Sequence, residues 1–148
     1  MKTSIISEKI LKGGCLIEPS DEKSIFQLSK QKLVNIFEEK GLIIFRNFNL
    51  DKLKITKFTD IFTTKYANDA LRRSVRLKNN KVRDVDPGKL EMPLHSEASY
   101  SPSWPEIIWF YCVKPPKKNG ETTICDGIRL WQSLSFDTKN FFLLVGIS

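Results

Sequence analysis

Two amphipathic segments with a short apolar run between them occupy the first 70 residues. In the first segment, Pro19-Ser20-Asp21 precedes apolar residues at helical spacing, and Gly41 stands where a helix would end. The apolar run at residues 42–45 predicts a buried strand. A second helix is predicted to begin near Asp51. The apolar positions that predict the two helices are Ile25, Leu28, Leu33, Ile36 and Phe37 in the first, and Phe58, Ile61, Phe62 and Tyr66 in the second.

The pattern changes in the last third of the chain. Residues 107–113 are apolar on both alternating faces, which predicts a strand covered on both sides. Asn119-Gly120 predicts a turn, and residues 121–125 predict the returning strand of a hairpin. Asp126 then predicts the cap of a short helix that runs to Leu134. Because helices come early and strands late, an α+β fold with an antiparallel sheet is favoured.

Residues 67–90 separate these two patterns and are polar, basic and weakly periodic, which predicts a long loop. The chain carries a net charge of +7, and its densest basic run, residues 72–83, lies in this loop. An anionic partner such as nucleic acid is one interpretation of that charge. The run holds no aromatic side chain to stack on bases, and no nucleic-acid motif surrounds it. A solvated loop is therefore favoured over a nucleic-acid partner.

Length and composition limit the class of protein. With 148 residues and 41% hydrophobic side chains, the chain is large enough for one domain with a core of its own. No apolar run approaches the roughly 18–20 residues that cross a bilayer, and Glu8 and Lys9 interrupt the N-terminal apolar stretch before a signal peptide develops. Cys15, Cys112 and Cys125 have unrelated spacings, which predicts reduced thiols. We therefore expect a cytoplasmic protein with no membrane partner.

One short motif offers metal chemistry: His95, the only histidine of the chain, stands two residues before Glu97. In an extended segment, two such residues share a face, with Cα atoms about 6.6 Å apart. An imidazole and a carboxylate on one face supply two of the three ligands of the 2-His-1-carboxylate triad of non-haem Fe(II) oxygenases. The tripeptide alone favours a simpler alternative, a solvated or hydrogen-bonded histidine beside an acid.

Further motifs surround this pair, and they add specificity through their order and spacing. They are Leu94-His95-Ser96-Glu97-Ala98-Ser99-Tyr100, Trp104-Pro105, Ile108-Trp109-Phe110-Tyr111-Cys112, Gly120-Glu121-Thr122 and Asp126-Gly127-Ile128-Arg129. Together they resemble the central block of the TauD/TfdA family of Fe(II)- and 2-oxoglutarate-dependent dioxygenases. Residues 41–48 are similar to an early strand of the same family. The resemblance implies a partial double-stranded β-helix (jelly-roll) with N-terminal helices.

The resemblance also implies roles for three residues. His95 and Glu97 become iron ligands, and a carboxylate at 97 favours oxygenation, because related halogenases have a small residue there. The hydroxyl of Thr122 helps to hold the distal carboxylate of 2-oxoglutarate; without the family context, Thr122 is more simply a β-branched strand residue. The implied activity is hydroxylation of a small metabolite such as an amino acid, with Fe(II) as cofactor and 2-oxoglutarate and O₂ as cosubstrates. No residue is assigned as a catalytic acid or base.

The sequence departs from the family in one respect. The family's second iron-binding histidine and its 2-oxoglutarate-binding arginine lie far downstream of the first histidine, and this chain has no other histidine. We therefore expect residues 1–148 to be the truncated N-terminal portion of such a domain, which holds Fe(II) weakly and has little activity alone. The alternative is a non-catalytic remnant or interaction module of the same fold.

Overall fold

The computed structural model describes residues 2–5, 13–19, 24–67, 81–85, 92–99, 102, 104–118 and 120–145. Its elements are β1 (Lys2–Ile5), β2 (Cys15–Glu18), the 3-10 helix η1 (Ile25–Gln27), α1 (Lys30–Lys40), β3 (Ile43–Phe45), α2 (Lys52–Asp60), α3 (Gly127–Ser133) and α4 (Phe136–Val145). Within these ranges, the chain therefore combines helices and strands, as the α+β prediction requires.

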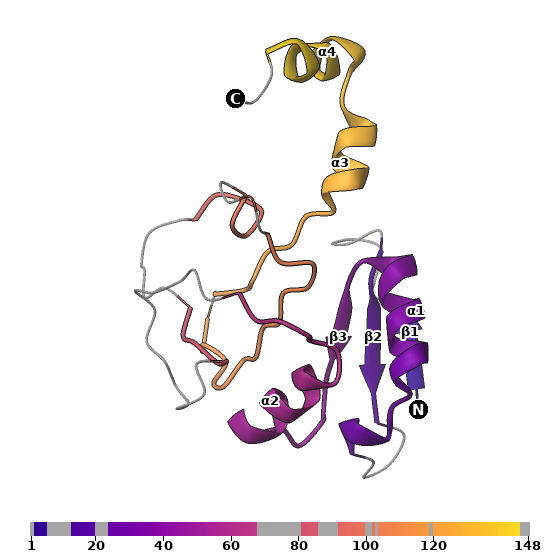
Figure 1. The fold of residues 1–148 in the computed structure, drawn as a ribbon, viewed down its shortest axis with the longest axis vertical. Coiled ribbons are helices and arrows are strands. Elements are labelled where there is room, and N and C mark those ends of the chain that lie inside the picture. The colour runs from indigo at the N-terminus through magenta and orange to yellow at the C-terminus, as the bar shows by residue number, and fades with distance from the viewer. Residues whose placement is uncertain are drawn as a thin grey trace.

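The three strands form a small open sheet in the order β1-β2-β3 (Figure 1). β1 pairs antiparallel with β2, with Ile5 opposite Cys15. β2 pairs parallel with β3, with Cys15 opposite Ile43, because the chain crosses over through η1 and α1 between these two strands. The expectation of an antiparallel sheet is therefore wrong for this pair. The sequence pattern predicts neither β1 nor β2, because a strand of four residues is too short to show a clear alternation of apolar and polar side chains.

Helix α1 begins later than the pattern predicts and ends where it predicts. The chain first forms η1, and the Ser29 side chain then caps α1 by accepting a hydrogen bond from the Lys32 backbone N–H at 3.4 Å. The predicted cap at 20–21 lies outside the described residues. Gly41 ends the helix with a left-handed φ of 68°, and its N–H donates to the Phe37 carbonyl at 2.7 Å.

The predicted strand at 42–45 and the helix after Asp51 are confirmed as β3 and α2. The predicted face of that helix reaches too far, because α2 ends at Asp60 and Ile61, Phe62 and Tyr66 follow it. The Asp51 carboxylate accepts hydrogen bonds from the backbone N–H groups of Leu53 and Lys54, at 2.9 and 2.7 Å. Two of the N–H groups that a first helical turn leaves without partners are thereby satisfied. Asp126 caps α3 in the same way, as predicted, with two bonds of 3.1 Å. The sequence pattern does not predict α4.

The hydrophobic core joins β2, η1, α1 and α2. Its most central aromatic side chain is Phe58, which is 1% exposed. The Phe58 ring makes edge contacts with the rings of Phe45, Phe62 and Trp109, with centroids 5.4, 5.3 and 5.8 Å away. The contact between Trp109 and Phe58 therefore packs a segment that is distant in sequence against α2. The buried members of this core are Cys15, Ile17, Ile25, Leu33 and Phe58.

The two strands predicted at 107–113 and 121–125 are wrong, because the structure describes both segments as irregular. The first does keep an alternation: Trp109 and Tyr111 are partly buried, whereas Ile108 and Phe110 are 47% and 61% exposed. The Tyr111 hydroxyl donates to the Leu50 carbonyl at 2.7 Å. A strand needs a neighbouring backbone to complete its ladder, and the described residues offer none to these segments. The jelly-roll fold stays a prediction.

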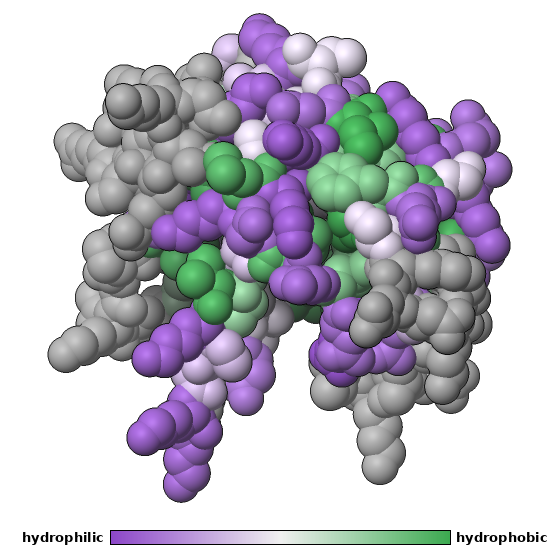
Figure 2. Space-filling view, turned by 90° about the horizontal axis from the view of Figure 1, so that it is seen from below, coloured by the Kyte–Doolittle hydropathy of each residue, from purple (hydrophilic) through white to green (hydrophobic). Residues whose placement is uncertain are grey.

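Helices α3 and α4 extend away from the sheet towards the opposite end of the molecule (Figure 1). Apolar side chains of α4 are open to solvent, among them Leu143 and Leu144 at 70% and 85% exposure. On the face shown in Figure 2, green apolar side chains also reach the surface between purple hydrophilic ones. Within the described ranges, no helix combines the length and the apolar character that crossing a membrane requires.

Candidate metal centre

His95 and Glu97 lie on an irregular segment, residues 92–99, which enters a turn at Glu97. The Nε2 atom of His95 is 3.8 Å from Oε2 of Glu97, so the two side chains converge. His95 precedes this turn, and Glu97 is its first central residue. The Ser99 backbone N–H closes this turn by donating to the Ser96 carbonyl at 3.4 Å.

The imidazole of His95 is held by a backbone carbonyl. Its Nδ1 atom lies 2.9 Å from the carbonyl oxygen of Pro93, which can only accept a hydrogen bond. The hydrogen-bond pattern therefore assigns a proton to Nδ1, so that in the neutral imidazole the lone pair is on Nε2, the nitrogen nearer to Glu97. Metal-binding histidines are commonly fixed in this way. The side chains of His95 and Glu97 are 50% and 31% exposed, so both donors are open to a small solute.

The two donor atoms are of the types that bind Fe(II), and the distance between them is close to the one that a shared metal ion requires. One imidazole nitrogen and one carboxylate oxygen make up two-thirds of a facial triad. Adjacent donors on a metal with bonds of about 2.1 Å lie roughly 3 Å apart, so small side-chain rotations close the gap from 3.8 Å. No group of three His, Cys, Asp or Glu side chains suited to a metal ion occurs among the described residues.

Thr122 lies on an exposed, irregular stretch that follows Gly120. Gly120 has a positive φ of 83°, and a Cβ there would be 3.0 Å from the Cγ atom of Pro116, so the turn requires glycine. Among the described residues, no hydrogen bond joins Thr122 to His95 or Glu97. Asn119, the other notable residue of this turn, lies outside the described residues. A contact between Thr122 and 2-oxoglutarate stays a prediction.

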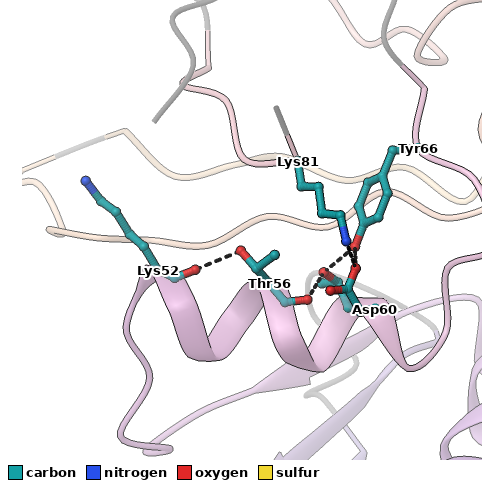
Figure 3. Close-up of polar contacts among 6 residues, drawn as sticks. Lys52, Thr56, Asp60, Tyr66 and Lys81 are labelled. Atoms are coloured by element: carbon teal, nitrogen blue, oxygen red, sulfur yellow. Dashed lines mark hydrogen bonds and ion pairs between the residues drawn. The ribbon is translucent and has the colours of Figure 1, made fainter. Parts of the chain in front are cut away.

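A polar cluster at the C-terminal end of α2 has no counterpart in the sequence predictions (Figure 3). The Lys81 ammonium and the Tyr66 hydroxyl both donate to Oδ1 of Asp60, at 2.6 and 2.8 Å. The Tyr66 hydroxyl also lies 2.9 Å from Oγ1 of Thr59, and the Lys81 ammonium is 5.1 Å from the centre of the Tyr66 ring. The apolar pattern of the sequence places Tyr66 on the same predicted helix face as Phe58, and it does not predict the polar contacts of the Tyr66 hydroxyl.

This cluster shifts the pKa values of its members. The hydrogen bond from Lys81, aided by the one from Tyr66, holds the pKa of Asp60 below its ordinary value. The same carboxylate raises the pKa of Lys81. Burial is the main reason why the pKa of Tyr66 is raised. Through Lys81, the cluster joins residues 81–85, which precede the candidate metal site in the sequence, to the helix that carries Phe58.

Sequence comparison places these features in a family. The family model described as "Taurine catabolism dioxygenase TauD, TfdA family" matches residues 17–147. No curated protein and no solved structure matches the chain. The matched range begins within β2, ends two residues beyond α4, and includes His95, Glu97 and Thr122. Since this range covers most of the chain, the protein belongs to the TauD/TfdA family of dioxygenases.

Proposed function

We propose that this chain provides part of the active site of an Fe(II)- and 2-oxoglutarate-dependent oxygenase that hydroxylates a small metabolite such as an amino acid. Membership of the TauD/TfdA family indicates a dioxygenase in general terms. The observation that carries the proposal is the 3.8 Å approach of His95 Nε2 to Glu97 Oε2, with the other imidazole nitrogen directed at the Pro93 carbonyl. Fe(II) bound there would allow O₂ and 2-oxoglutarate to oxidise an aliphatic C–H bond.

His95 and Glu97 act in this proposal as metal ligands and not as an acid and a base. The imidazole offers a neutral nitrogen donor that the Pro93 carbonyl orients in advance. The Glu97 carboxylate offsets one positive charge of the cation. Because this 148-residue sequence has a single histidine, it supplies two of the three ligands of a 2-His-1-carboxylate triad.

Thr122 is proposed to bind 2-oxoglutarate through its hydroxyl group. The side chain is exposed and follows the tight turn at Gly120, so the hydroxyl is accessible to a ligand. A hydrogen bond from a hydroxyl to a carboxylate contributes about 1.5–3 kcal/mol. The three cysteines of the chain are free, which supports a reducing compartment and hence a cytoplasmic location for the proposed enzyme.

Anaerobic titration of the full chain with Fe(II) and 2-oxoglutarate tests the metal site. The unmodified chain should develop the visible charge-transfer band of an Fe(II) chelate, and His95→Ala and Glu97→Ala should abolish it. Glu106→Ala is the matched control, because Glu106 is an exposed glutamate outside the pair. A band that survives His95→Ala would overturn the assignment. Absence of any band in the unmodified chain would favour the non-catalytic alternative.

A second titration isolates the role of Thr122. Thr122→Ala should weaken 2-oxoglutarate binding in the presence of Fe(II) by about tenfold or more, the equivalent of one charge-assisted hydrogen bond. Thr123→Ala is the control, since Thr123 is the neighbouring threonine and is also exposed. Fe(II) affinity should be the same in both variants. Equal 2-oxoglutarate affinity in the two variants would remove Thr122 from the site.

A further inference from the structure

We propose that the His95–Glu97 pairs of two copies of this chain together bind one tetrahedral divalent cation such as Zn(II), so that the metal joins the copies into a symmetric dimer. The inference goes beyond the proposed function, because it concerns another cation and a second copy of the chain. It uses the same two donor side chains, but it does not require oxygenase activity.

The separation of the two donor atoms matches a tetrahedral cation more closely than an octahedral one. Nε2 of His95 and Oε2 of Glu97 are 3.8 Å apart. With metal–ligand bonds of about 2.1 Å, two donors lie roughly 3.4 Å apart at a tetrahedral angle and roughly 3.0 Å apart at a right angle. The tetrahedral arrangement therefore needs the smaller movement of the side chains. Zn(II) favours this arrangement and accepts both imidazole nitrogen and carboxylate oxygen.

One copy of the chain supplies half of such a site. His95 is the single histidine of the 148-residue sequence, and the described residues contain no group of three His, Cys, Asp or Glu side chains suited to a metal ion. A structural tetrahedral site has four protein ligands, so the pair leaves two positions for other donors. A second copy offers the same imidazole and the same carboxylate, and a two-fold axis through the cation makes the two pairs equivalent.

The pair lies on a segment that a second copy can approach. The side chains of His95 and Glu97 are 50% and 31% exposed. Nδ1 of the imidazole faces the Pro93 carbonyl, so Nε2 is the nitrogen that a cation can reach. On the same segment, the apolar side chains of Met92 and Leu94 are 61% and 62% exposed. A second copy that shares the cation would partly cover these side chains, which adds a favourable contribution from apolar burial.

Charge also favours two pairs over one at the cation. A pair with a neutral imidazole carries one negative charge, so two pairs balance the two positive charges of the cation, whereas one pair leaves an excess. The copies repel each other, because the net charge of each chain is +7. Salt screens this repulsion beyond about 8 Å at physiological ionic strength, whereas the short metal–ligand contacts are screened much less. The dimer should therefore be tighter at moderate salt than at low salt.

Zn(II) titration of the full chain in about 0.15 M NaCl, followed by sedimentation velocity, tests the inference. The mass should double as Zn(II) reaches one equivalent per two chains, and EDTA should reverse the change. His95→Ala should abolish the doubling, and Glu97→Gln should weaken it at least tenfold. Both substitutions are at accessible side chains, so the fold should be retained. Glu106→Gln is the matched control, because Glu106 is an exposed glutamate outside the pair.

Co(II) gives a second readout, because tetrahedral Co(II) absorbs visible light much more strongly than octahedral Co(II). The strong band should saturate at one Co(II) per two chains. Binding of one cation per chain without a change in mass would overturn the inference, and so would a doubled mass that persists in EDTA or in His95→Ala.

The anaerobic Fe(II) titration keeps this inference apart from the proposed function. A charge-transfer band with Fe(II) and 2-oxoglutarate, but no dimer with Zn(II), would support the proposed function and overturn the shared site. A Zn(II)-dependent dimer without the Fe(II) band would support the shared site and count against the oxygenase.

Discussion

Residues 13–67 and residues 104–145 both contain many apolar side chains, but among the described residues of these two regions only the first has fully buried ones. Ile17, Leu33 and Phe58 are between 0% and 3% exposed, whereas Phe136 and Leu144 are 75% and 85% exposed. In the first region, a parallel strand pair and two helices present complementary faces to one another. In the second, α3 and α4 have no packed layer opposite them among the described residues (Figure 1). An apolar pattern therefore predicts burial only where the chain also supplies the opposing surface.

The candidate metal centre belongs to neither region in sequence, since residues 92–99 lie between them. The link to the packed region runs through Trp109, which contacts Phe58 and Phe62, and through Tyr111, which donates to the Leu50 carbonyl. The buried indole N–H of Trp109 has no hydrogen-bond acceptor among the described residues. The contacts of this aromatic pair thus anchor the chain that follows the site to the core, although that chain forms no strand.

The largest difference between the two regions should appear when one phenylalanine is truncated in each. Phe58→Ala should lower the free energy of unfolding by about 3–5 kcal/mol, because it removes a fully buried ring and leaves a cavity. Phe136→Ala should change it by less than about 0.5 kcal/mol, because that ring is exposed. Urea unfolding followed by tryptophan fluorescence measures both values. Similar losses in the two variants would contradict the division of the molecule into a packed and an open region.

A smaller effect is expected at the two helix caps, which are chemically alike. Asp51 and Asp126 each accept two backbone N–H bonds at the start of a helix. Asp51→Ala should cost about 1 kcal/mol of global stability, because α2 carries the core residue Phe58. Asp126→Ala should loosen α3 alone and leave the urea midpoint of the core unchanged. Amide hydrogen exchange distinguishes these results, and a lower midpoint in Asp126→Ala would show that α3 unfolds together with the core.

The outcome at these caps also shows what the sequence can predict. Asp51, Gly41 and Asp126 were sufficient to locate helix boundaries, because a cap or a left-handed terminus depends on chemistry within a few residues. The prediction of strands at 107–113 and 121–125 is wrong, because the pairing of a strand depends on a partner that is distant in sequence. The two-residue spacing of His95 and Glu97 predicts that their side chains converge, as they do, but the left-handed backbone of Ala98 in the turn that follows has no pattern in the sequence.

The cluster at Asp60 predicts a modest pH dependence of the packed region. The folded-state pKa of this carboxyl is lowered, so its contribution to stability is complete above the ordinary pKa and is lost as pH falls through the lowered value. Asp60→Asn should therefore flatten the fall in urea midpoint between about pH 5 and pH 2. Lys81→Met, which removes the main partner, should flatten it similarly. Unchanged pH profiles in both variants would show that the pair does not stabilise the folded state.

The smallest effect is expected from charging one exposed leucine in each region. Leu53 on α2 and Leu144 on α4 are 62% and 85% exposed, so a lysine at either position should alter the free energy of unfolding by less than about 0.5 kcal/mol. The two variants should differ in surface behaviour, because Leu144 adjoins other exposed apolar residues of α4 and Leu53 lies between lysines. Leu144→Lys should therefore reduce the binding of a hydrophobic dye and the tendency to aggregate, and Leu53→Lys should change neither. If Leu144→Lys instead destabilises the core, α4 packs against it, and the contrast between the two regions fails.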